Sequence, residues 1–169
     1  MNAGLNTNSL YNALLRPLRW DALFANQTGP YYDIYALRCE DWCNIDVWQH
    51  IRDEMKFRLF GRHSRKCKLI EKEIHARQYN IPPDTPLIPV KSAFGGLGIY
   101  RTEALRGLRY SCKDKNGRMT CEHVPLHLAM KKRGANLFID PNLLNSTPKE
   151  HIGRNSGADF PISLIAKFQ

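Results

Sequence analysis

The 169-residue chain lacks both a long apolar run and an export signal. It contains no stretch of eighteen consecutive apolar residues, the length that a membrane-spanning helix needs. Residues 1–4 have neither a basic region nor an apolar core, so they do not look like the start of a signal peptide. From these two absences we expect a cytoplasmic protein that folds around its own core.

Cysteine is scarce, with five residues in the chain. An odd number without an export signal favours free thiols in a reducing compartment. Cys39 and Cys43 have the spacing C-x3-C, but no matching C-x2-C or H-x3-H pair follows closely. This pair therefore provides only half of the usual ligand set for a structural zinc ion.

Acidic residues are outnumbered, 16 against 25 Lys and Arg, and the formal net charge is +9. The excess gathers in residues 52–77, where nine basic side chains face four acidic ones. Such a segment can contact nucleic-acid phosphates, acidic lipid headgroups at a membrane surface, or only water. A basic nucleic-acid-binding α/β protein is thus an alternative interpretation. We do not favour nucleic acid as a partner, because the chain has no aromatic–glycine RNA-binding motif.

Hydrophobic periodicity predicts alternating strands and helices, and hence an α/β class with a mixed sheet flanked by helices, in a single domain over 1–169. The expected strands are residues 20–26, 97–101, 109–112 and 135–139, with 31–38 as a further strand or extended loop. The expected helices are residues 9–15, 46–60, 65–79, 103–106 and 121–133, followed by a final apolar segment at 161–168.

Capping and turn residues set the expected element ends. Asn8 and Thr120 are predicted to cap the helices that follow them, because Asn and Thr side chains accept hydrogen bonds from first-turn amides. Gly61 is predicted to end the second helix. Asp140 and Pro141 are predicted to close the last strand, because proline has no amide hydrogen for a ladder.

Two neighbouring segments look like a site in outline. Residues 93–101 place three glycines among apolar residues, and glycine lets a ligand lie directly on the backbone or forms a bulge or tight turn. Residues 121–127 place Glu122 at the start of a predicted helix. The helix dipole favours the ionised carboxylate there, which suits a general base and equally suits an acid that only stabilises the helix.

Three motifs carry a resemblance to a known family. They are YYDIYALR at residues 31–38, FGGLGIYR at 94–101, and CEHV at 121–124 with LFIDP at 137–141. In order and spacing they resemble the acceptor-side, C-terminal part of GT-A-fold nucleotide-sugar glycosyltransferases, whose relatives include microbial and fungal capsule mannosyltransferase-like proteins. The similarity spans roughly residues 20–145.

This resemblance implies a GT-A-like (Rossmann-like) sheet and inverting transfer of a sugar from a nucleotide-sugar donor to a glycan or polysaccharide acceptor. It also implies a divalent metal, Mn or Mg, held by a D-x-D element. No D-x-D occurs in this chain. We therefore expect the chain to be the acceptor-side portion of a longer enzyme, or a remnant that only binds a glycan or partner.

The resemblance assigns Glu122 the role of catalytic base. It implies substrate contacts from Asp33, Arg38, Phe94, Gly95, Gly96 and His123. His151 is a candidate late ligand for the metal or diphosphate, with an ordinary loop histidine as the alternative. For Asp33 the alternative is a structural Asx turn. His123 and His127, four residues apart, could also share a zinc ion, although no third ligand is evident.

Overall fold

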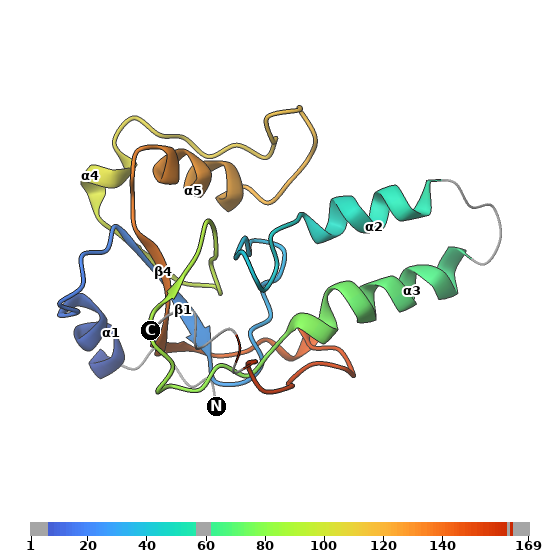
Figure 1. The fold of residues 1–169 in the computed structure, drawn as a ribbon, viewed down its shortest axis with the longest axis horizontal. Coiled ribbons are helices and arrows are strands. Elements are labelled where there is room, and N and C mark those ends of the chain that lie inside the picture. Colours follow the sequence, from blue (N-terminus) through green and yellow to red (C-terminus); the bar gives the residue numbers. More distant parts are fainter. Residues whose placement is uncertain (1–6, 57–61, 162, 164–169) are drawn as a thin grey trace.

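A computed structural model describes residues 7–56, 62–161 and 163. These residues form a four-stranded mixed sheet with the order β2-β4-β1-β3. β1 (Ala22–Gln27) runs parallel to β4 (Leu137–Asn145) and antiparallel to β3 (Gly98–Tyr100), and β2 (Ile88–Pro89) is antiparallel to β4. The predicted α/β class, with a mixed sheet flanked by helices, is confirmed (Figure 1).

β1 is the centre of the sheet, and all six of its residues are buried. Side chains alternate between the two faces of a strand. Ala22 and Phe24 accordingly join one hydrophobic cluster, while Leu23 and Ala25 join another. The strand is apolar on both faces because both faces are covered, as is usual for strands that pair in parallel.

Different helices cover the two faces. α1 (Thr7–Leu14) contributes Ala13 to the cluster around Leu23, and α5 (His123–Lys132) contributes Met130 to the cluster around Phe24. α4 (Thr102–Leu105) is a single turn between β3 and the long connection to α5.

α2 (Val47–Met55) and α3 (Arg62–Glu73) pack side by side and project away from the sheet as a pair (Figure 1). Val47, Ile51 and Met55 repeat every four residues and bury one face of α2. We call this pair the hairpin. A 3₁₀ turn at His75–Arg77 follows α3, and another at Lys149–His151 follows β4.

Two expected elements differ. The helix predicted for 65–79 begins at Arg62 and stops at Glu73, and the structure assigns no strand to residues 109–112. Residues 31–38 are an irregular loop, not a strand. The predictions for residues 57–61, including Gly61, and for most of 161–168 fall outside the described residues.

The prediction that Asp140 and Pro141 close the last strand is wrong. β4 continues to Asn145, and its register with β1 shifts between Ala25 and Asn26. The side chain of Asn26 donates to the Pro141 carbonyl at 3.0 Å and so bridges the irregular step. A bulge tolerates proline because one residue there makes no regular ladder bond.

Both predicted N-caps are also wrong. Asn8 lies inside α1, and the Thr120 hydroxyl donates to the Asp46 carboxylate at 2.7 Å instead of capping α5. Glu122 occupies the N-cap position of α5 and makes no side-chain capping bond. Asp46 caps α2, since its side chain accepts from the Gln49 amide at 2.9 Å. None of the helices in the described part of the chain combines the length and apolarity that crossing a membrane demands.

Candidate functional site

The loop at residues 94–97, which we call the glycine loop, lies at the carboxyl ends of the parallel strands β1 and β4. The Gly95 carbonyl accepts hydrogen bonds from the side chains of Gln27, at 2.8 Å, and Asn145, at 3.2 Å. These two residues end β1 and β4. The carboxyl edge of parallel strands is where open α/β sheets bind their ligands.

Both glycines of this loop are required by packing. Gly95 and Gly96 have φ angles of 65° and 77°. A Cβ on Gly95 would lie 2.4 Å from the Ala25 carbonyl oxygen, and one on Gly96 would lie 2.9 Å from the Tyr32 hydroxyl. The structure thus gives these glycines the tight-turn role that the sequence left open, and the turn fixes the position of Phe94 before it.

Asp33 joins the glycine loop to residues 31–38. One carboxylate oxygen accepts from the Ala36 amide at 3.1 Å, and the other accepts from the Gly95 amide at 3.2 Å. The first contact spans three residues, one more than the Asx turn that the sequence offered as an alternative, and it likewise gives Asp33 a structural role. Burial raises the pKa of Asp33, and the hydrogen bonds from Ala36 and Gly95 act against that rise.

Glu122 and His123 lie on the same side as Asp33. The Glu122 side chain is 51% exposed, and its Oε1 lies 3.7 Å from His123 Nε2. The Glu122 charge is close enough to raise the pKa of Asp33, while burial lowers the pKa of His123 against the pull of both carboxylates. The structure therefore brings together three predicted site residues, two carboxylates around one imidazole.

Two aromatic rings pack against His123. The Phe94 ring stacks on His123 with centroids 3.9 Å apart, and Tyr110 packs edge-on against His123 at 5.6 Å. His123 Nδ1 is buried and has no hydrogen-bond partner among the described residues. Sequence reasoning placed Tyr110 in a strand and did not assign it to the site, and the structure has no strand there.

His127, one helical turn after His123, makes a polar contact through each of its ring nitrogens. Its Nδ1 lies 2.9 Å from the Ser92 hydroxyl and its Nε2 lies 2.9 Å from the Tyr100 hydroxyl. Burial, with a further contribution from His123, lowers the pKa of His127 to about 3. The ring is therefore neutral, and hydroxyl groups occupy the nitrogens that the zinc ion considered for the two histidines would need.

A cleft of about 420 Å³ opens beside Asp33. Its lining consists of Tyr32, Asp33, Tyr35, Trp48, Ile70, Ile74, His75, Gln78, Glu150 and His151. The His151 ring stacks on Tyr32 with centroids 5.3 Å apart. His151, predicted as a late ligand, thus reaches the same cleft as Asp33. The sequence could not foresee the part played by His75 and Gln78, which come from a turn after α3.

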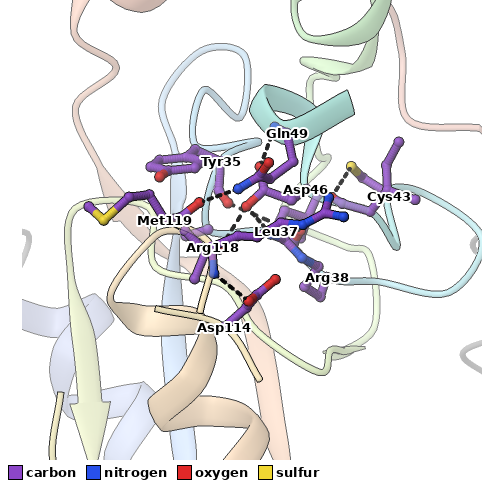
Figure 2. A network of polar contacts seen from close by, with 12 residues as sticks. Tyr35, Leu37, Arg38, Cys43, Asp46, Gln49, Asp114, Arg118 and Met119 are labelled. Atoms are coloured by element: carbon purple, nitrogen blue, oxygen red, sulfur yellow. Dashed lines mark hydrogen bonds and ion pairs between the residues drawn. The ribbon is translucent and has the colours of Figure 1, made fainter. Parts of the chain in front are cut away.

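Of the predicted site residues, Asp33 and His151 line this cleft, whereas Phe94, Gly95, Gly96, Glu122 and His123 do not. Arg38 makes structural contacts (Figure 2). Its guanidinium is buried, donates to the carbonyl oxygens of Tyr35 at 3.0 Å and Leu37 at 2.6 Å, and pairs with the Asp46 carboxylate at 3.2 Å. Since Asp46 also caps α2, Arg38 fastens the 31–38 loop to the hairpin. These contacts make it a positioning residue and leave it no described contact with the cleft.

The described residues gather no set of metal ligands. Nowhere in residues 7–56, 62–161 and 163 do three or more His, Cys, Asp or Glu side chains come together as ligands. Cys39 and Cys43 are buried free thiols joined by a backbone hydrogen bond.

Comparison of the chain with protein-family models, with curated proteins and with solved structures finds no match. The resemblance to GT-A-fold glycosyltransferases accordingly stays a prediction.

Proposed function

We propose that this chain is the acceptor side of a GT-A-like glycosyltransferase, with Glu122 as the base. The observation that carries the proposal is the cluster of Glu122, His123 and Asp33 beside the glycine loop, at the carboxyl edge of the sheet. It would move a sugar from a nucleotide-sugar donor to a glycan or polysaccharide acceptor.

Glu122 suits the base better than Asp33 does. Both Asp33 oxygens accept hydrogen bonds from backbone amides, so this carboxylate is already used to hold the loop. Burial raises the pKa of Asp33. The Glu122 carboxylate is half exposed and makes no capping bond, so it is free to meet an acceptor hydroxyl. A base must lie within hydrogen-bond reach of the proton that it takes.

The reaction then balances as an inverting displacement. An acceptor hydroxyl passes its proton to Glu122 while its oxygen attacks the anomeric carbon, and the nucleoside diphosphate leaves with the electrons of the broken C–O bond. The His123 ring lies beside the Glu122 carboxylate and stacks on Phe94. Tyr32, Tyr35 and Trp48 offer ring faces along the cleft, which suit the C–H faces of sugars.

Glu122→Gln tests this assignment, because it keeps the shape and removes the base. In the intact protein that contains this chain, we expect release of nucleoside diphosphate from a panel of UDP- and GDP-sugars, with glycan acceptors, to fall about a hundredfold or more. Glu103→Gln, an exposed acid in α4, is the matched control and should retain turnover. Wild-type turnover in a folded Glu122→Gln variant would remove Glu122 from the mechanism. Glycan binding without any turnover would favour the binding-only remnant.

A further inference from the structure

A second concavity, of about 600 Å³, lies between the two helices of the hairpin. It is lined by Trp48, Ile51, Arg52, Met55, Lys56, Arg62, His63 and Lys66. Four of these side chains are cations, and none of the described residues that line it is acidic. Trp48, Ile51 and Met55 supply an apolar floor. We call this concavity the basic groove.

Three of the four acids in the described hairpin pair with Lys or Arg, and the fourth, Glu71, lies 3.0 Å from His75 Nδ1. Glu54 pairs with Arg65 at 3.2 Å, and Glu73 pairs with Arg77 at 2.7 Å. Asp53 pairs with Lys56 and with Arg118 of the connection before α5. The described hairpin residues and the turn after them (47–56 and 62–77) hold eight basic and four acidic side chains, a difference of +4.

The cations left over all face solvent. Arg62, Lys66 and Lys68 are exposed and form no ion pair with any residue that the structure describes. They lie along α3, which projects from the sheet beside α2 (Figure 1). Two of these unpaired cations, Arg62 and Lys66, line the basic groove, whereas Lys68 lines a different concavity of α3.

We propose that the hairpin docks on the surface of an anionic phospholipid bilayer. Phosphate and carboxylate headgroups would meet the cationic rim, and glycerol and upper acyl groups would meet the apolar floor. A single-stranded nucleic acid fits less well, because the groove offers one indole ring, Trp48, where such ligands use a series of stacking rings. The proposal does not depend on the glycosyltransferase assignment.

Vesicle co-sedimentation of the full chain tests the proposal. We expect binding to phosphatidylcholine vesicles that contain about one-third phosphatidylserine, weakening at high salt, and no binding to phosphatidylcholine alone. Each basic residue near such a surface strengthens binding about fivefold. The double variant Arg62→Gln/Lys66→Gln should therefore bind about 25-fold more weakly.

The matched control is Lys113→Gln/Lys115→Gln, which removes the same charge from exposed lysines outside the hairpin. It should bind nearly as well as wild type. Equal losses in the two double variants, or equal binding to vesicles with and without phosphatidylserine, would overturn the proposal. Tighter binding to single-stranded RNA than to the anionic vesicles at the same salt would also overturn it, and would give the groove to nucleic acid.

Tryptophan emission tests the apolar floor separately. Trp20 and Trp42 are buried, at 4% and 6% exposure, whereas Trp48 is half-buried at the groove. Anionic vesicles should therefore shift the emission to the blue through Trp48, and Trp48→Phe should abolish that shift while sedimentation persists. An unchanged shift in Trp48→Phe would show that the bilayer contacts another part of the chain.

Discussion

Two ion pairs of the same length show how two regions differ: the sheet-edge site, which is the cluster of Asp33, Glu122 and His123 beside the glycine loop, and the hairpin. Arg38 and Asp46 lie 3.2 Å apart with side chains 7% and 15% exposed, and Arg65 and Glu54 lie 3.2 Å apart with side chains 34% and 44% exposed. The first pair fastens the loop that carries Asp33, and the second lies on the surface of the hairpin. Distance alone therefore says little about what a pair does.

The two pairs differ in how much water reaches their charges. A charge that loses its partner in a buried setting cannot be rehydrated, whereas an exposed one can. We infer that polar groups at the sheet edge fix one arrangement of the site. In the hairpin, Arg62 and Lys66 are exposed and form no ion pair with a described residue, so they remain available to a partner.

The largest expected difference comes from breaking these two pairs. Arg38→Met should lower the free energy of unfolding by about 4 kcal/mol, because Asp46 and the two carbonyls lose their donor. Arg65→Met should cost about 0.5 kcal/mol. Urea denaturation of both variants measures the two effects, and similar losses would mean that burial does not distinguish the regions.

Glycine positions sharpen the comparison next. Gly95→Ala should cost about 3 kcal/mol, since the methyl group meets the Ala25 carbonyl and the backbone has a positive φ. Gly117→Ala, also at positive φ but with nothing within 4 Å of its Cβ, should cost about 1 kcal/mol. Thermal and urea unfolding separate the packing contribution from the conformational one. Equal costs would leave conformation as the whole explanation.

Acid sensitivity gives the smallest of the three effects. The pKa of His127 is about 3 in the folded protein and 6.5 when exposed. As the pH falls, the imidazole is therefore protonated in the unfolded chain before it is protonated in the folded one, and this favours unfolding. Its contribution to stability is complete above pH 6.5 and is lost as the pH falls, by about 2 kcal/mol between pH 6.5 and pH 5.

His127→Gln should remove that part of the pH dependence, because an amide can contact Ser92 and Tyr100 without titrating. His63→Gln, which replaces an exposed histidine of the hairpin, should leave the dependence as in wild type. A His127→Gln variant that still weakens as steeply toward pH 5 would place the acid sensitivity elsewhere.

The sequence predicted what depends on neighbouring residues. The mixed α/β class, the central strand and both hairpin helices follow from local periodicity, and the positive φ of Gly95 and Gly96 follows from their lack of a side chain. Caps failed because capping is a competition between groups distant in sequence. Thr120 donates to Asp46, 74 positions away, and not to its own helix.

The sequence by itself determined the chemistry available: a carboxylate at the head of α5, a glycine turn, and a basic segment with apolar residues at helical spacing. Only the tertiary structure decided how each group is used. It buried Arg38 against Asp46, and it placed Glu122 at the surface beside His123. The physical reason is that burial and long-range hydrogen bonds set whether a polar group is an anchor or is free to react, and neither is encoded in local spacing.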